Sequence, residues 1–71
     1  MKFLSYRDFS YIIKYKRIDL NYQQKDIAFY LTISKSKYCK IENGLQEPTF
    51  IELQMICHIL DLDFNKLVLK K

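Results

Sequence analysis

Apolar residues recur along the chain at the three- and four-residue spacing of amphipathic helices, in short runs separated by polar breaks. The first run contains Phe9, Ile12 and Ile13, and it stops near residues 19–21. Residues 1–4 could be extended, but no run alternates apolar and polar residues over the length of a strand. The pattern therefore predicts an all-α chain.

Two short helices with a tight connection follow the first one. The earlier of them runs from about Gln24 to Leu31, and the later one opens at Ser34 as its cap and reaches Asn43. Gly44, the sole glycine of the chain, comes directly afterwards, where a left-handed helix end favours glycine. The segment from about 24 to 43 thus has the order helix, turn and helix, which is typical of a helix-turn-helix.

The last third of the chain predicts two more helices. Thr49 and Glu52 have the spacing of a capping box, and the helix that they open carries one apolar stripe. That stripe consists of Leu53, Ile56, Cys57 and Leu60. Asp63 is the expected cap of a fifth helix. The five segments predict a compact five-helix bundle, and residues 1–71 are too few for more than one domain.

Charge divides the chain into two halves. Residues 14–40 contain seven basic and two acidic residues, a balance of +5, whereas residues 41–65 contain five acidic residues and no Lys or Arg. The second segment therefore has a balance of −5 within a chain whose net charge is +4. Such a division is typical of a protein that docks a polyanion on one face, although a merely solvated surface fits the charges equally well.

Composition excludes several classes of protein. With 49% apolar residues and one Pro, the chain is globular rather than disordered. It has no run of 18 apolar residues and no signal-peptide core at its start, so we expect a cytoplasmic protein without membrane contact. Cys39 and Cys57 are too few for a disulfide framework or a zinc site. Without paired carboxylates, a glycine loop or a nucleophile–base set, we expect no enzyme, no cofactor and no metal.

The pair of helices over residues 24–43 has the packing that DNA recognition needs. Ala28 is small enough to let the second helix cross closely over the first. An apolar clamp then fixes the crossing, and its members are Leu31, Ile33, Tyr38 and Ile41. The opposite face of the second helix is left free to enter a major groove.

At this point the sequence resembles the lambda-repressor-like (Cro and phage-repressor, or XRE) helix-turn-helix family, over roughly residues 9–68. The residues that carry the resemblance are Lys16, Arg17, Gln24, Ile27, Ala28, Leu31, Ile33, Ser34, Ile41, Glu42, Asn43, Gly44, Pro48, Thr49 and Leu60. The resemblance implies a five-helix fold whose third helix reads DNA, in a family of mostly repressors that often act as dimers. Two positions depart from the family: Thr32 stands where it often has Gly, and Gln23 where it commonly has a Ser or Thr cap.

The resemblance also implies roles for individual residues. Positions matching Lys35, Ser36 and Lys40 approach base edges in the family, and the position matching Gln24 holds a phosphate. Helical spacing turns further polar groups to the same face, and the expected DNA-binding set is Gln24, Lys35, Ser36, Lys37, Lys40 and Asn43. The alternative for these lysines is a solvated surface. Arg17 and Glu42 match a family pair, which implies a partly buried structural ion pair.

A surplus of apolar residues near the end of the chain predicts a two-fold dimer on an inverted-repeat operator. The expected interface consists of Leu45, Phe64, Leu67, Val68 and Leu69, unless these side chains simply close the core of the monomer. Four aromatic residues are expected on exposed faces, namely Tyr11, Tyr15, Phe29 and Tyr30. The sequence thus predicts a transcriptional repressor that binds double-stranded DNA. The alternative is an antitoxin or another regulator that uses the same fold to bind a partner protein.

Overall fold

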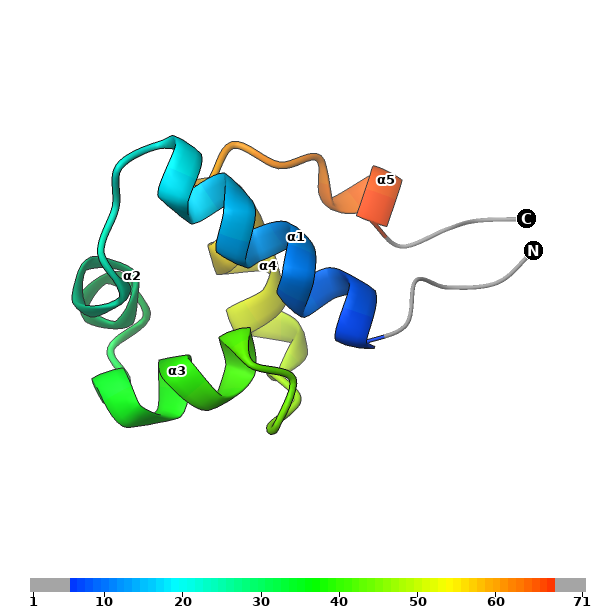
Figure 1. Ribbon diagram of the computed structural model, residues 1–71. Coiled ribbons are helices and arrows are strands. Elements are labelled where there is room, and N and C mark those ends of the chain that lie inside the picture. Colours follow the sequence, from blue (N-terminus) through cyan, green and yellow to red (C-terminus); the bar gives the residue numbers. More distant parts are fainter. Residues whose placement is uncertain (1–5, 68–71) are drawn as a thin grey trace.

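The computed structural model describes residues 6–67, and every regular element in this range is a helix. These helices are α1 (Tyr6–Asp19), α2 (Gln24–Leu31), α3 (Lys35–Glu42), α4 (Phe50–Ile59) and α5 (Phe64–Leu67). In Figure 1, α2 is seen almost end-on, whereas α3 lies across the view below α1, so α2 and α3 cross steeply. The all-α class is confirmed. Four helices of eight or more residues carry the described fold, and α5 is a single helical turn of four residues within it, so the predicted bundle of five helices is not confirmed.

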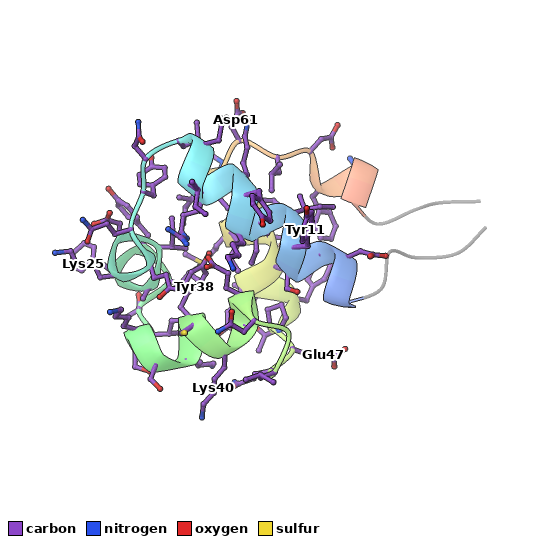
Figure 2. The ribbon with its side chains drawn as sticks, in the orientation of Figure 1. Tyr11, Lys25, Tyr38, Lys40, Glu47 and Asp61 are labelled. Carbon is purple, nitrogen blue, oxygen red and sulfur yellow. The ribbon has the colours of Figure 1, made fainter. Side chains whose placement is uncertain are left out.

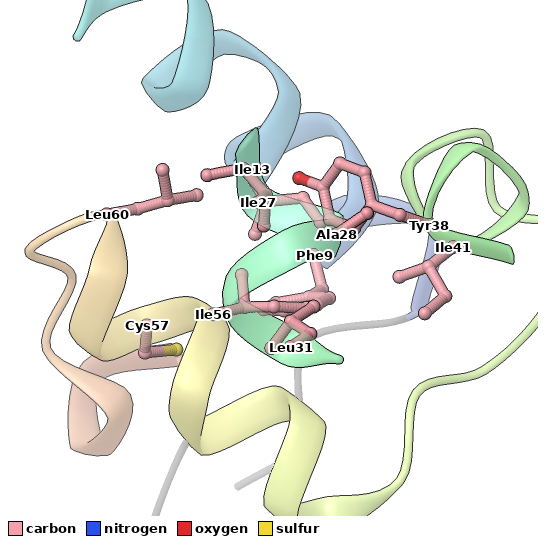
Figure 3. Close-up of a cluster of buried hydrophobic side chains, with 10 residues drawn as sticks. All are labelled: Phe9, Ile13, Ile27, Ala28, Leu31, Tyr38, Ile41, Ile56, Cys57 and Leu60. Atoms are coloured by element: carbon pink, nitrogen blue, oxygen red, sulfur yellow. The ribbon is translucent and has the colours of Figure 1, made fainter. Parts of the chain in front are cut away.

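The core is formed by the inner faces of α1 to α4, with the residue that ends α4 (Figure 3). Its buried hydrophobic side chains are Phe9, Ile13, Ile27, Ala28, Leu31, Tyr38, Ile41, Ile56, Cys57 and Leu60. The predicted inner faces of the second and fourth helices belong to this core, with Leu53 packed at its edge. The packing of α3 is mainly against α2 and α1. The small, buried Ala28 lies in α2, where its size permits this close approach.

The turn between α2 and α3 contains Thr32 in the left-handed region, at φ 61° and ψ 40°. A residue with a branched Cβ pays about 1–2 kcal/mol in this region, where glycine would be unstrained. The following amide closes the turn, because Ile33 N–H donates to the Ala28 carbonyl at 3.1 Å. Ile33 also packs against the core. The chain therefore keeps the left-handed turn despite the departure from Gly.

The connection between α3 and α4 begins at Gly44, as the sequence predicted. Gly44 has φ 77°, and the next amide, that of Leu45, donates back to the Lys40 carbonyl at 2.8 Å. A Cβ at this position would lie 3.4 Å from the Ser10 hydroxyl oxygen. The backbone angle therefore favours glycine here, whereas the distance to Ser10 is that of an ordinary van der Waals contact.

The helix starts are capped at the expected residues. Ser34 Oγ accepts from Lys37 N–H at 3.0 Å at the start of α3. In the capping box of α4, Thr49 Oγ1 accepts from Glu52 N–H at 3.1 Å, and Glu52 Oε1 accepts from Thr49 N–H at 2.9 Å. Asp63 Oδ1 accepts from Asn65 N–H at 2.9 Å. No helix in the range 6–67 combines the length and the apolar character needed to cross a membrane.

Candidate nucleic-acid interface

The two faces of α3 differ sharply in chemistry. Tyr38 and Ile41 are fully buried, whereas Lys35, Ser36 and Lys40 are exposed on the other side. Figure 2 shows Tyr38 pointing into the domain and Lys40 pointing away from it. The exposed face presents two ammonium groups and a hydroxyl, which are donors suited to base edges and phosphate oxygens.

Asn43 continues this exposed row at the end of α3. It is the C-terminal cap of the helix, and its side-chain amide donates to Cys39 Sγ at 3.3 Å. Asn43 is exposed and Cys39 is half-buried beside it. The structure therefore places Asn43 outward, on the side of Lys40, as the helical spacing predicted.

A shallow polar hollow lies where the first turn of α2 meets the start of α3. It is lined by Arg17, Gln23, Gln24, Lys25 and Lys35. Lys25 and Lys35 supply exposed ammonium groups there, which suit a phosphate group, whereas the third cation, Arg17, is engaged by Glu42. Lys25 is exposed and points away from the domain in Figure 2. The sequence prediction omitted Lys25, although its place directly after Gln24 at the start of a helix was a usable signal.

The buried carboxylate of Glu42 joins three helices. It ends α3 and accepts from Arg17 Nε at 2.7 Å, from Arg17 Nη2 at 2.9 Å and from Gln24 Nε2 at 3.0 Å. Arg17 Nη1 also donates to the Tyr22 carbonyl at 2.8 Å. The two residues that the resemblance paired are thus in contact, and Gln24 is drawn into the same network.

Burial and hydrogen bonding act in opposite directions on the Glu42 carboxyl. Its side chain is 0% exposed and that of Arg17 is 12% exposed. Burial alone would raise the pKa of Glu42, but hydrogen bonds from Arg17 and Gln24 outweigh this effect and hold the pKa below 4.5. The hydrogen bond to Glu42 likewise raises the pKa of Arg17. Both groups are therefore charged at neutral pH, and the end of α3 is fixed against α1.

Lys37 lies apart from the other lysines of α3. Its Nζ is 3.0 Å from Glu52 Oε2 in the first turn of α4. Burial would raise the pKa of the Glu52 carboxyl, but hydrogen bonds from the Thr49 backbone and from Lys37 lower it below the ordinary value. The sequence placed Lys37 in the DNA-facing set, whereas in the structure its ammonium group is engaged with α4.

The residues expected at a dimer interface are only partly within the described range. Leu45 is exposed in the loop after α3. Phe64 is half-buried, and its ring packs edge-on against that of Phe50 with the centroids 5.5 Å apart. The side chain of Leu67, together with Val68 and Leu69, lies outside the described residues.

Exposed apolar side chains also occur where the sequence predicted none. Tyr11, Tyr15, Phe29 and Tyr30 are exposed, as expected. The fourth helix adds three more exposed apolar residues, namely Phe50, Ile51 and Met55. The four-residue spacing of Ile51 and Met55 was the signal for a second apolar stripe on α4, opposite the buried one.

A family model for helix-turn-helix domains, HTH_3, matches residues 13–67. The chain belongs to this family. HTH_3 comprises XRE/Cro/C1-type domains, so the resemblance seen in the sequence is confirmed. Membership implies DNA binding by a domain of a non-enzymatic family. No curated protein and no solved structure gave a match to the chain.

Proposed function

We propose that this HTH_3 protein is a transcriptional repressor that binds a specific double-stranded DNA site with α3 in the major groove. The observation that carries the proposal is the exposed face of α3, on which Lys35, Ser36 and Lys40 lie opposite the buried Tyr38 and Ile41. This arrangement leaves hydrogen-bond donors free on the one face that the core does not use.

The proposed contacts divide between bases and phosphates. Ser36, Lys40 and Asn43 reach base edges from the middle and end of α3. Gln24, at the start of α2, holds a phosphate together with Lys35, because both line the polar hollow between the two helices. Gln24 uses one amide hydrogen on Glu42, and its second is available for a phosphate oxygen.

The proposed repressor acts as a two-fold dimer on an inverted repeat, inside the cell, where DNA is found. The interface consists of Leu45, Phe64, Leu67, Val68 and Leu69. The exposed side chain of Leu45 supports this assignment, because an isolated apolar loop residue gains from being covered. Such a dimer would set two α3 helices about 34 Å apart, one turn of DNA.

Selection of bound duplexes from a random pool tests this function directly. We expect enrichment of one inverted repeat, and affinity for it falling by about 10³–10⁵ between 50 and 200 mM salt if the dimer neutralises six to ten phosphates. Light scattering on wild type and on the Leu45→Asp variant tests the dimer. A pool that yields no enriched sequence contradicts the function, and a monomer on a single half-site contradicts the dimer alone.

A second candidate function is the binding of a protein partner, as in an antitoxin. A hollow between α2 and α4 is lined by Tyr30, Ile51, Gln54, Met55, His58 and Ile59. The exposed residues of α4, from Phe50 to His58, include no Asp, Glu, Lys or Arg, and such a depletion of charged residues is typical of the centre of a protein interface. Co-purification with the product of a neighbouring gene tests this candidate. Ile51→Asp should abolish that complex and leave DNA binding unchanged.

A further inference from the structure

The three lysines of α3 are treated differently by the rest of the domain. Lys35 and Lys40 are exposed, whereas Lys37 is half-buried and its Nζ lies 3.0 Å from Glu52 Oε2. The side chain of Glu52 is only 12% exposed, and that of Lys37 is 36% exposed. The Lys37 charge is therefore largely balanced by a carboxylate within the protein before any DNA arrives.

The carboxylate that receives Lys37 is held in place by α4 itself. Glu52 Oε1 accepts from Thr49 N–H at 2.9 Å in the capping box, while Oε2 faces Lys37. A carboxylate already oriented by a backbone amide loses little further freedom when it binds an ammonium group. Because α3 packs mainly on α1 and α2, this ion pair also gives α3 a link to α4.

We propose that Glu52 restrains Lys37, so that Lys37 positions α3 on α4 instead of binding phosphate, and that this restraint lowers the attraction of the domain for DNA of any sequence. The proposal rests on the proposed DNA-binding function. A free lysine beside the reading face would release counterions from every duplex equally. Restraint of Lys37 thus leaves discrimination to side chains that reach base edges, such as Lys40.

Glu52 takes part in both the ion pair and the helix cap, and one substitution removes the ion pair while keeping the cap. Glu52→Gln removes the negative charge but keeps a side-chain oxygen for Thr49 N–H, because Gln is as suitable as Glu at this position of a capping box. Glu47→Gln is the matched control, since Glu47 is an exposed carboxylate just before α4 and makes no ion pair in the described residues. Both variants change the net charge by the same amount.

The experiment measures affinity for a random-sequence duplex and for the selected operator over a range of salt concentrations. We expect Glu52→Gln to bind the random duplex several-fold more tightly than Glu47→Gln does, with a salt slope steeper by about 0.9 per subunit, the value for one added phosphate contact. Its preference for the operator over the random duplex should fall accordingly.

Lys37→Ala provides the second arm. As a single substitution, Lys37→Ala should leave the salt dependence of DNA binding unchanged. In the double variant with Glu52→Gln, it should remove the extra salt dependence that Glu52→Gln alone produces. Equal behaviour of Glu52→Gln and Glu47→Gln would overturn the inference, as would a loss of slope in Lys37→Ala as large as in Lys40→Ala. Wild-type protein that binds no duplex even at low salt would instead reject the proposed function, and this inference with it.

Discussion

Two ion pairs hold α3 to the rest of the domain, and they differ in their surroundings. At the end of α3, Glu42 is enclosed and receives Arg17 together with Gln24. In the first turn of α3, Lys37 meets Glu52 at the rim, where water reaches the ammonium group. The contacts are similar in length, 2.7 Å and 3.0 Å. The difference teaches that the degree of burial decides what an ion pair contributes. An enclosed pair contributes to the stability of the fold, whereas a pair at the rim changes the charge that the surface presents.

The energetic reason lies in what remains when one partner is lost. Removal of one member of a buried pair leaves the other charged and dry, which costs about 3–5 kcal/mol. Removal of Lys37 from the rim pair leaves Glu52, which keeps its hydrogen bond from Thr49 N–H and lies where water can take the place of the ammonium group. The cost is therefore smaller, about 1 kcal/mol or less. The first pair should therefore respond mainly in stability, and the second mainly in DNA binding.

The largest expected effect is that of Arg17→Ala on stability. This change strands the Glu42 carboxylate without its principal donor, and we expect a loss of about 3 kcal/mol in the free energy of unfolding. Urea unfolding of the purified variant measures it. Lys37→Ala is the control from the other pair and should lose less than about 1 kcal/mol. A wild-type midpoint for Arg17→Ala, with weakened DNA binding, would make Arg17 a phosphate contact instead.

Lys40→Ala should show the reverse pattern, because neither ion pair holds this lysine. The side chain is exposed on the proposed reading face, so its loss should leave the free energy of unfolding within about 0.5 kcal/mol of wild type. Operator affinity should fall by about 1–3 kcal/mol, with relaxed preference at one base pair if Lys40 reads a base. Competition binding against single-base variants of the operator measures both effects. Unchanged affinity would remove Lys40 from the interface.

Thr32→Gly should stabilise the turn that leads into α3. Thr32 has φ 61°, so Gly relieves strain but also gives the unfolded chain more freedom, and we expect a net gain of about 1 kcal/mol or less. Gly44→Ala is the opposite test, since Gly44 has φ 77°, where an alanine side chain is strained. The two midpoints in urea should move in opposite directions. A lower midpoint for Thr32→Gly would show that the branched side chain contributes packing that exceeds its strain.

The difference between local and long-range interactions explains what could be predicted from the sequence. Periodicity and caps act between neighbours along the chain, and they gave the helix-turn-helix, the cap at Ser34 and the glycine turn at Gly44. The Arg17–Glu42 contact came from the family resemblance, since no local pattern joins residues 25 positions apart.

The interaction of Lys37 with Glu52 could not be predicted in this way. Helical spacing puts Lys37 at the edge of the outward face of α3, and only the packing of α4 brings a carboxylate there. The exposed apolar residues Ile51 and Met55 were missed for a different reason. The buried stripe alone was enough to predict α4 as an amphipathic helix. Nothing in the sequence indicated what the apolar residues on its other face would contact.

The smallest expected effect is the difference between Glu42 and Glu52 in how much stability each contributes as the pH falls. In the folded protein the pKa of both Glu42 and Glu52 lies below its ordinary value of 4.5. A lowered pKa means that the folded state binds the proton less readily than the unfolded state does. Each carboxylate therefore contributes stability that is fully present above about pH 4.5 and is lost as the pH falls through its folded pKa.

Urea unfolding of wild type, Glu42→Gln and Glu52→Gln between pH 7 and pH 3 measures the two contributions. We expect stability to fall with acid in all three proteins, with the shallowest fall in Glu42→Gln, because Glu42 receives the guanidinium in an enclosed site. Glu52→Gln should follow the wild-type curve closely, since solvent screens its ammonium partner. The slope of each curve is compared, rather than its height, so that a constant cost of either substitution cancels. Equal slopes for the two variants would mean that the rim pair contributes to folding as strongly as the buried one.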